Sequence, residues 1–246
     1  MKMLLAETGK PLIQHTYEAA AKSKMAEAVI VATDHPEIQS AVESFGGRVV
    51  MTDANHISGT DRVAEVAGRF EEFDLSDIEI IVNVQGDEPE IDAAAIDRLI
   101  NSLAENEHAA VSTLAAPIRE ASRLQDSSSV KVVLDASGHA MYFSRSPIPA
   151  VRDKDRLPEL LKSTPPSFLQ HVGVYAYRRK FLLQIPSLPA TMIEQMESLE
   201  PLRFLDAGWP IRVEILDHSG CASKGIDTAE DYALFVKRTA KRKDYR

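Results

Sequence analysis

Short apolar runs rich in β-branched residues alternate with segments of helical periodicity through the first hundred residues, and this alternation constrains the fold more than any other feature. The strand-like runs are residues 27–33, 48–51 and 78–84. The segments 38–45, 63–70 and 96–103 repeat apolar side chains every three or four positions, as on one face of a helix. Repeated strand–helix units predict an α/β fold of mostly parallel strands, with helices on both faces of the sheet.

The second half of the chain departs from this alternation. Residues 130–134 and 140–143 flank a polar turn that ends at Gly138, which predicts a hairpin. Prolines then crowd residues 147–166 and indicate an excursion from the main sheet. We also expect strands at 168–177 and 211–216, a helical pair over 178–207, and a last helix from about Asp227. Together these features predict one domain over residues 1–246, with a loop and β excursion at about 135–177.

Charge and cysteine content exclude several classes of protein. Lys and Arg number 28 and Asp and Glu number 37, so the formal net charge is −9. This argues against binding to a nucleic-acid polymer or an anionic membrane, since such binders present basic faces. Cys221 is the only cysteine, which excludes an intrachain disulfide and fits a cytoplasmic protein with a buried structural thiol. No run of 18 apolar residues occurs, and the early acidic Glu7 argues against a signal peptide.

Polar residues follow the strand-like run 78–84 abruptly, in the order Gln85-Gly86-Asp87-Glu88-Pro89. Open α/β sheets bind ligands beyond the carboxyl ends of their strands, so this segment is a candidate site. Gly86 permits close backbone approach, and Asp87 offers the oxygen ligand that Mg²⁺ prefers. The alternative interpretation is that Gln85 and Asp87 only cap the following turn.

Two further segments place polar side chains at expected helix starts. Ser58, Gly59 and Thr60 open a helix whose N–H groups could hold an anion or a base edge, with Arg62 as a nearby cation. A capped helix start with a surface arginine explains the same residues. Asp227, with Glu230 three residues later, is equally typical of a helix cap. Asp34 likewise follows a strand-like run and is a plausible N-cap for the next helix.

Residues of the second half offer further polar groups. Period two places His171, Gly173 and Tyr175 on one face of a strand, where His171 could donate a hydrogen bond to a ligand. A histidine in a strand can also be a satisfied structural residue. Arg145 could hold a carboxylate with two parallel hydrogen bonds, or form an ordinary ion pair.

Six blocks along the chain resemble, in their order, the 3-deoxy-manno-octulosonate cytidylyltransferase family, the CMP-Kdo synthetases. The blocks are Ala-Thr-Asp (32–34), His-x-Ser-Gly-Thr-Asp-Arg (56–62), Val-Asn-Val-Gln-Gly-Asp-Glu-Pro (82–89), Tyr-Phe-Ser-Arg-x-Pro-Ile-Pro (142–149), His-x-Gly-x-Tyr-x-Tyr (171–177) and Gly-Ile-Asp-Thr-x-Glu-Asp (225–231). The second and third blocks are the specific ones. The resemblance extends from Lys2 almost to the C-terminus.

This resemblance implies a fold, a reaction and a set of residues. The fold is a Rossmann-like α/β domain of the nucleotide-diphospho-sugar transferase type, whose excursion serves dimerisation and sugar binding. The reaction joins CTP and Kdo to give CMP-Kdo and diphosphate, for lipopolysaccharide synthesis by a cytoplasmic homodimer. Asp87 and Asp227 are implied as catalytic Mg²⁺ ligands. The implied substrate contacts are Lys2, Ser58, Gly59, Thr60, Arg62, Gln85, Arg145, His171, Tyr175 and Glu200.

The chain departs from the family pattern at two places. Pro201 stands where the family usually has Gln, which removes one candidate side-chain contact to the sugar. Family members also begin with a central strand and a Ser/Arg/Pro-Gly-Lys loop that holds the triphosphate, of which only Lys2 has a counterpart here. Either the start is set too late, or the chain is a truncated, weak or inactive relative. The alternatives are therefore another CMP-sugar synthetase or a non-catalytic homodimer.

Overall fold

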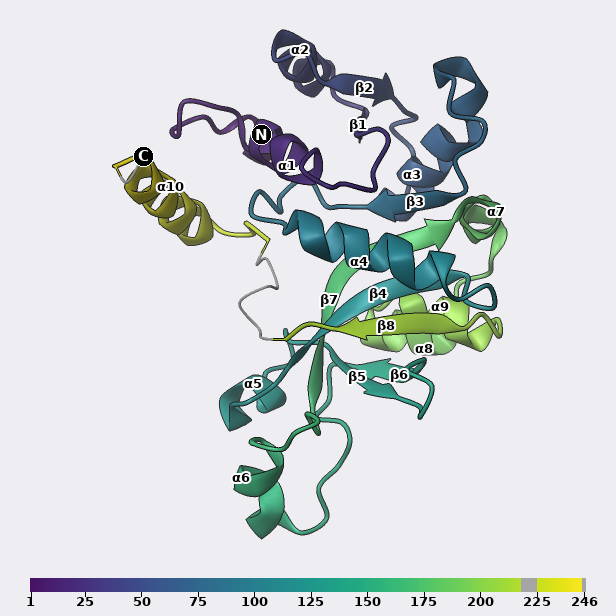
Figure 1. The fold of residues 1–246 in the computed structure, drawn as a ribbon, viewed down its shortest axis with the longest axis vertical. Coiled ribbons are helices and arrows are strands. Elements are labelled where there is room, and N and C mark those ends of the chain that lie inside the picture. Colours follow the sequence, from purple (N-terminus) through teal and green to yellow (C-terminus); the bar gives the residue numbers. More distant parts are fainter. Residues whose placement is uncertain (218–224, 245–246) are drawn as a thin grey trace. The chain divides into compact units, whose positions relative to one another are not determined.

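The computed structural model describes residues 1–217 and 225–244, and its contacts divide the chain into two compact units (Figure 1). Unit 1 comprises residues 1–76, 84–97 and 223–246, and unit 2 comprises residues 77–83 and 98–222. The expectation of one domain with an excursion at 135–177 stays a prediction. Cys221, for which we expect a buried thiol, lies outside the described residues.

Unit 1 contains a small parallel sheet with helices around it. Its elements are η1 (Lys2–Leu4), α1 (Leu12–Ala20), β1 (Ile30–Thr33), α2 (Pro36–Ser44), β2 (Arg48–Met51), α3 (Gly59–Gly68), η2 (Phe70–Phe73), the start of α4 (Ala93–Ala104) and α10 (Ala229–Asp244). β1 and β2 pair in parallel, with Ile30 opposite Arg48, and α2 connects them. Ile13, Val31, Ile38 and Val42 form a core cluster. The strand–helix–strand unit predicted over 27–51 is thus confirmed.

Unit 2 is built on a six-stranded sheet. Its strands are β3 (Ile80–Asn83), β4 (Val111–Pro117), β5 (Lys131–Leu134), β6 (Ala140–Ser144), β7 (Leu169–Arg178) and β8 (Ile211–Ile215). Its helices are α5 (Ala121–Gln125), η3 (Lys154–Arg156), α6 (Leu157–Leu160), α7 (Arg179–Leu182), η4 (Ile185–Ser187), α8 (Met192–Glu197) and α9 (Pro201–Asp206), besides the end of α4. The strand order is β6-β5-β7-β4-β8, with β3 also paired to β7.

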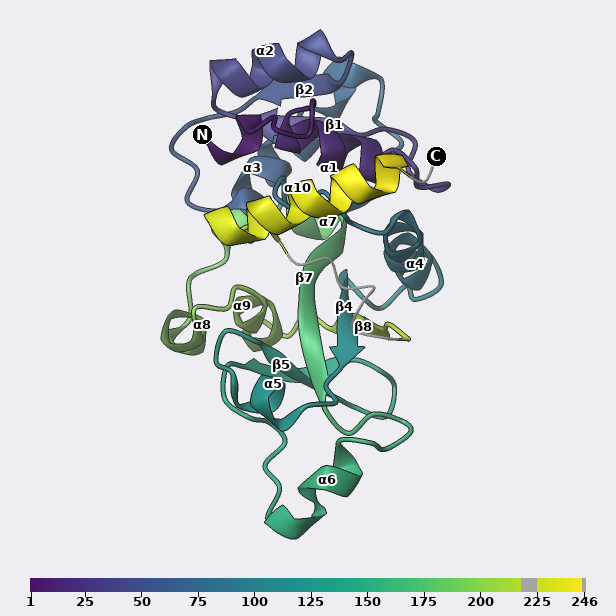
Figure 2. The same cartoon turned by 90° about the vertical axis from the view of Figure 1, so that its left-hand side faces the viewer.

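The long strand β7 organises this sheet (Figure 2). It runs antiparallel to β4 along one edge, and its other edge pairs with β5 near Leu169 and with β3 near Tyr177. β4 and β8 are parallel neighbours. The α/β class is therefore confirmed, and the sheet is mixed: among its described strands β4 and β8 form one parallel pair, and the four antiparallel pairs all involve β7 or the β5–β6 hairpin.

Two segments differ from expectation for identifiable reasons. β4 was not predicted, because all seven of its residues are buried and small residues such as Ala115 and Ala116 hide any alternation. The helical pair expected over 178–207 is divided into α7, η4, α8 and α9. Proline interrupts the series at Pro186 and Pro201, and Ser198 ends α8 in the left-handed conformation. The hairpin at 130–143 is confirmed by the antiparallel pairing of β5 and β6.

Within the described residues, no helix has both the length and the apolar composition needed to cross a bilayer.

Candidate active site

Asp87 and Asp227, the two carboxylates singled out in the sequence, lie close together in unit 1. The ammonium of Lys2 is 2.7 Å from Asp87 Oδ2 and 3.8 Å from Asp227 Oδ1. The backbone N–H of Ile226 donates to the carbonyl oxygen of Asp87 over 2.9 Å. A β-carbon placed on Gly225 would lie 3.9 Å from Asp87 Cγ and 4.0 Å from Asp227 Oδ2. The pair is thus assembled by a backbone contact and bridged by one cation.

The chemistry of this donor set suits a magnesium ion. Among the described residues, no group of three or more His, Cys, Asp or Glu side chains could hold a metal. Mg²⁺ commonly takes only one or two protein carboxylates and completes its shell with water and substrate phosphates. The ammonium of Lys2 indicates that a positive charge is stabilised beside the two carboxylates. The residues present therefore fit Mg²⁺ bound together with a phosphate-bearing substrate.

Neither aspartate has the capping role that the sequence left open. The start of α10 is capped by Thr228, whose hydroxyl accepts from the Asp231 N–H over 3.1 Å, while Asp231 Oδ2 accepts from the Thr228 N–H over 3.0 Å. The cap predicted at Asp227 and Glu230 is therefore wrong by one residue. The turn after β3 is closed by backbone, with the Glu88 N–H donating to the Gln85 carbonyl. The Asp87 carboxylate instead receives Lys2.

Gly86 is closely packed. A β-carbon at this position would lie 3.1 Å from Met3 Sδ and 3.2 Å from Ile13 Cδ1, which is tighter than ordinary contact. The Thr16 hydroxyl on α1 also donates to the Gly86 carbonyl oxygen over 2.7 Å. Close backbone approach at Gly86 is thus observed, and the approaching groups belong to η1 and α1.

The start of α3 lies against Gln85. Ser58 is the N-cap, and its hydroxyl accepts from the Asp61 N–H over 3.0 Å, so the predicted capped helix start is confirmed. A β-carbon on Gly59 would lie 3.7 Å from Gln85 Nε2, and Thr60 is buried. The structure therefore brings Ser58, Gly59, Thr60 and Gln85 together within unit 1.

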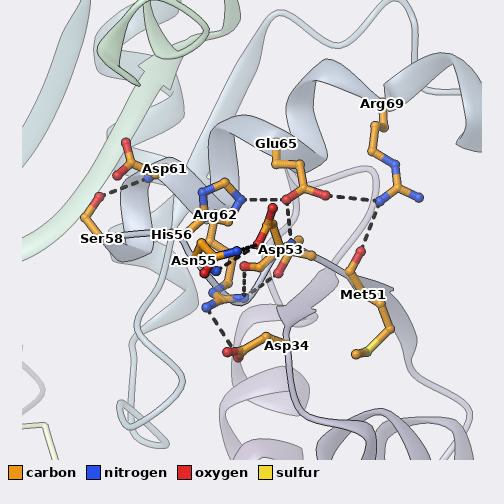
Figure 3. Close-up of polar contacts among 11 residues, drawn as sticks. Asp34, Met51, Asp53, Asn55, His56, Ser58, Asp61, Arg62, Glu65 and Arg69 are labelled. Carbon is orange, nitrogen blue, oxygen red and sulfur yellow. Dashed lines mark hydrogen bonds and ion pairs between the residues drawn. The ribbon is translucent and has the colours of Figure 1, made fainter. Parts of the chain in front are cut away.

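Arg62 is half-buried and not a surface arginine. Its guanidinium is 3.3 Å from Asp34 Oδ1, donates to Thr52 Oγ1 over 2.5 Å, and reaches the Asp53 carbonyl oxygen at 3.4 Å (Figure 3). The N-cap of α2 is His35, so the prediction of Asp34 as a cap is also wrong: its carboxylate pairs with Arg62 instead. Arg62 thus connects the ends of β1 and β2 to α3, and its contact with substrate stays a prediction.

In unit 2, His171 and Tyr175 are ring neighbours, with centroids 5.3 Å apart. The register of β7 against β4 shifts here, since Thr113 pairs with Tyr175 and Leu114 with Val172. The buried Thr113 hydroxyl lies 3.0 Å from His171 Nε2, and 3.2 and 2.9 Å from the carbonyl oxygens of Val172 and Val174. Thr113 therefore supports the irregular stretch of β7 that carries both rings.

Burial sets the protonation of these two rings. It lowers the pKa of His171 to about 4, so the imidazole is neutral at physiological pH. Burial, with a smaller contribution from the negative charge of Glu200, raises the pKa of the Tyr175 hydroxyl. Glu200 itself precedes α9, where Pro201 occupies the first turn without disrupting the helix. Both rings are thus held as neutral hydrogen-bonding groups.

Among the described residues, Arg145 does not form the ordinary ion pair that was one of its two predicted contacts. Its Nε donates to the Glu197 carbonyl oxygen over 2.7 Å, and its Nη atoms reach the carbonyls of Ser127 and Ser198 at 3.3 and 3.4 Å. The Glu197 carboxylate accepts from the Arg145 N–H over 2.9 Å. Arg145 therefore secures the C-terminal end of α8, and its binding to a substrate carboxylate stays a prediction.

Sequence reasoning missed a buried lysine next to this arginine. Lys131 is fully buried, and its ammonium donates to the carbonyl oxygens of Asp126, Ser129 and Arg145 at 2.9, 2.5 and 2.5 Å. Burial lowers the pKa of Lys131. A single lysine at the start of a strand carries no sequence signal for such a role, because its three acceptors are backbone carbonyl oxygens, which every residue type carries.

Replacing Thr113 with Val should lower the free energy of unfolding by about 1–3 kcal/mol, because two buried carbonyls and an imidazole lose their shared hydroxyl. Thr113→Ser keeps the hydroxyl and should cost only about 1 kcal/mol for the lost methyl group. Urea unfolding of the two variants measures the difference. Equal stability of the Val and Ser variants would show that the hydroxyl does not support β7.

Known proteins resemble this chain over most of its length. A family model described as cytidylyltransferase matches residues 1–215. The chain is 45% identical over 237 residues to a 3-deoxy-manno-octulosonate cytidylyltransferase of Rhodopirellula baltica, covering 96% of this chain and 91% of that protein. It is 46% identical over 239 residues to a protein of the same name from Geobacter sulfurreducens, covering 96% and 92%.

Two solved structures also resemble this chain. A structure of CMP:2-keto-3-deoxy-manno-octonic acid synthetase complexed with CTP has a TM-score of 0.87 and 38% identity, covering 98% of this chain and 92% of that chain. A 4-diphosphocytidyl-2C-methyl-D-erythritol synthase from Anaerococcus prevotii has a TM-score of 0.59 at 13% identity, which indicates a shared fold alone.

Proposed function

Because the chain belongs to the cytidylyltransferase family, we propose that it transfers the cytidylyl group of CTP to Kdo, giving CMP-Kdo and diphosphate. The observation that carries this proposal is the 45% identity to a protein of that name over 96% of the chain. The cluster of Lys2, Asp87 and Asp227 supports it, because a cation and two carboxylates suit a metal-bound triphosphate.

The reaction forms one phosphorus–oxygen bond and breaks another. The anomeric hydroxyl of Kdo attacks the α-phosphorus of CTP and loses its proton to solvent, the bond from that phosphorus to the bridging oxygen of the β-phosphate breaks, and diphosphate leaves with that electron pair. Because a sugar acid and a triphosphate are both anionic, the barrier is largely electrostatic. Asp87 and Asp227 would hold Mg²⁺, which when bound supplies positive charge for the attacking hydroxyl and the leaving diphosphate.

The remaining residues divide by unit. In unit 1, Lys2 offers its ammonium to the phosphates, while Gln85 and the turn Ser58–Gly59–Thr60 receive the nucleotide. In unit 2, four side chains serve the sugar acid: Arg145, His171, Tyr175 and Glu200. His171 and Tyr175 do so as neutral hydrogen-bonding groups, because burial disfavours their charged forms.

The protein works as a cytoplasmic homodimer in lipopolysaccharide synthesis under this proposal. Exposed apolar side chains in unit 2 support a self-association surface: Met141 is 62% exposed on β6, and Met192 and Met196 are 76% and 77% exposed on α8. Sedimentation of the purified protein at several concentrations measures its oligomeric state.

Diphosphate release from CTP in the presence of Mg²⁺ should depend on Kdo. A panel of sugar acids, including Kdo and sialic acid, tests this preference, and the product is identified by mass spectrometry. Kdo should give a kcat/KM at least about tenfold above that of any other acid, as a site built to hydrogen-bond one substrate achieves. Preference for another acid would indicate a different CMP-sugar synthetase, and release with none of them would contradict the transferase assignment.

A further inference from the structure

The loop between β2 and α3 is held at one residue, Asp53, through both of its backbone polar groups. The N–H of Asp53 donates to Glu65 Oε2 over 2.9 Å, and the Asp53 carbonyl oxygen receives Arg62 Nη1 at 3.4 Å. Arg62 and Glu65 are three residues apart on α3, so their side chains lie on neighbouring turns of one helix face. Two side chains of α3 therefore contact both backbone polar groups of Asp53, in the loop that precedes this helix (Figure 3).

Glu65 holds this loop at a second point. Glu65 Oε2 lies 2.6 Å from His56 Nε2, and its other oxygen receives Arg69 Nη1 at 3.3 Å. Arg69 Nη1 also donates to the carbonyl oxygen of Met51, the last residue of β2. The contacts of Glu65 thus extend from the end of β2 to His56, two residues before the N-cap Ser58.

The strength of these contacts differs from that of an ordinary surface ion pair. The side chains of Glu65 and His56 are only 26% and 22% exposed, and a charged acceptor makes short, strong hydrogen bonds. Burial by itself raises the pKa of Glu65, but the hydrogen bonds from the Asp53 N–H and His56 outweigh burial, so the pKa lies below its ordinary value. The carboxylate is therefore charged at neutral pH and available to both donors.

The loop matters because of where it ends. The loop leads directly into Ser58, Gly59 and Thr60 at the start of α3, and Gly59 lies against Gln85. Among the residues that the structure describes, the Glu65 carboxylate contacts Asp53, His56 and Arg69, and none of the three residues of the turn. Its effect on a ligand at the turn would therefore be indirect, through the path of the loop.

We propose that Glu65, together with Arg62, is a positioning residue that fixes the loop 52–58 and thereby sets the Ser58–Gly59–Thr60 turn for the nucleotide. The proposal rests on the proposed function, in which this turn receives CTP. Glu65 acts on substrate affinity without touching the substrate.

Three variants separate this role from general electrostatics. Glu65→Ala removes both contacts of this side chain with the loop, while Glu65→Gln keeps one amide oxygen that can take the place of Oε2, the atom that faces both Asp53 and His56. Glu72→Ala is the matched control, since Glu72 pairs with the same Arg69 at 3.0 Å from an exposed position and makes no polar contact with the described residues of the loop. Each variant is assayed for the KM of CTP, for kcat, and for amide hydrogen exchange at Asp53 and His56.

Glu65→Ala should raise the KM for CTP about tenfold while kcat stays within about threefold of wild type, because a displaced loop weakens binding more than chemistry. Exchange at the Asp53 amide should accelerate at least about tenfold in the same variant. Glu65→Gln should recover most of both losses, and Glu72→Ala should match wild type in both.

Several outcomes would contradict the proposed positioning role of Glu65. Fast exchange at Asp53 with an unchanged KM for CTP would mean that the loop does not position the turn, and unchanged exchange would mean that Glu65 does not hold the loop. Equal losses in Glu65→Ala and Glu72→Ala would assign the effect to surface charge. If wild-type protein makes no CMP-sugar, the proposed function fails. CTP binding measured by calorimetry, together with amide exchange, then still decides whether Glu65 positions the loop.

Discussion

Replacing Asp87 with Asn is expected to lower kcat for CMP-Kdo formation by about 10²- to 10³-fold, the usual loss when one electrostatic element of a transition state is removed. The fold should tolerate the change. The Asp87 carboxylate is 22% exposed and pairs with Lys2, so loss of this partly exposed pair costs about 1 kcal/mol or less. Steady-state diphosphate release and urea unfolding measure the two effects separately.

Glu90→Gln is the matched control for this experiment. Glu90 is three residues along the chain, its side chain is 23% exposed, and its carboxylate pairs with Arg238 at 2.6 Å. The control therefore breaks an ion pair of similar exposure outside the carboxylate cluster and should leave turnover unchanged. Near-normal turnover by the Asp87→Asn variant would refute a metal-holding role for that carboxylate.

Acid should destabilise the wild-type protein more than a variant that lacks the His171 imidazole. Between about pH 7 and about pH 4, the free energy of unfolding of wild type should fall relative to His171→Asn by up to about 3 kcal/mol. Burial lowers the pKa of His171 to about 4 from its ordinary value of 6.5. Between these values the unfolded chain binds a proton that the folded chain does not, so acid favours unfolding.

The sign of this effect defines the measurement. The contribution of His171 is fully present above about pH 6.5 and is lost progressively as the pH falls towards about 4. Urea unfolding across this range compares the two proteins, and only the change in their difference matters, because the Asn variant also loses the contact with Thr113. A difference that stays constant with pH would show that the imidazole is not held neutral by burial.

Local patterns predicted the elements whose signal is contained in a short window. β2 has the bounds expected for it, because Arg48–Met51 is a β-branched run that follows Gly47 directly. β4 could not be predicted, because it lies inside the sheet between β7 and β8 and all seven of its residues are buried, so its sequence shows no alternation. The mixed pairing of the sheet could not be predicted either, because the direction in which two strands pair is decided by contacts between distant segments.

The candidate site was also predicted only in part from the sequence. Motifs indicated Asp87 and Asp227, whose proximity requires the backbone bond from Ile226 to Asp87 and so is a property of the fold. The local pattern left Arg62 either as a cation beside an anion site or as a surface arginine, and its partners could not be foreseen because Asp34 and Thr52 lie at the ends of two other elements. Supporting residues such as Thr113 and Lys131 were missed for the reason that their acceptors are mainly backbone atoms.

The cap of α10 has a practical consequence for trapping substrates. Thr228 and Asp231 start this helix by themselves, so Asp227 carries no part of the helix boundary. Protein engineers usually face a compromise when an active-site carboxylate also maintains secondary structure, since the inactive variant then loses its native shape. Here an Asp227→Asn protein should retain the native start of α10, which makes it a suitable form for crystallising CTP and Kdo together before they react.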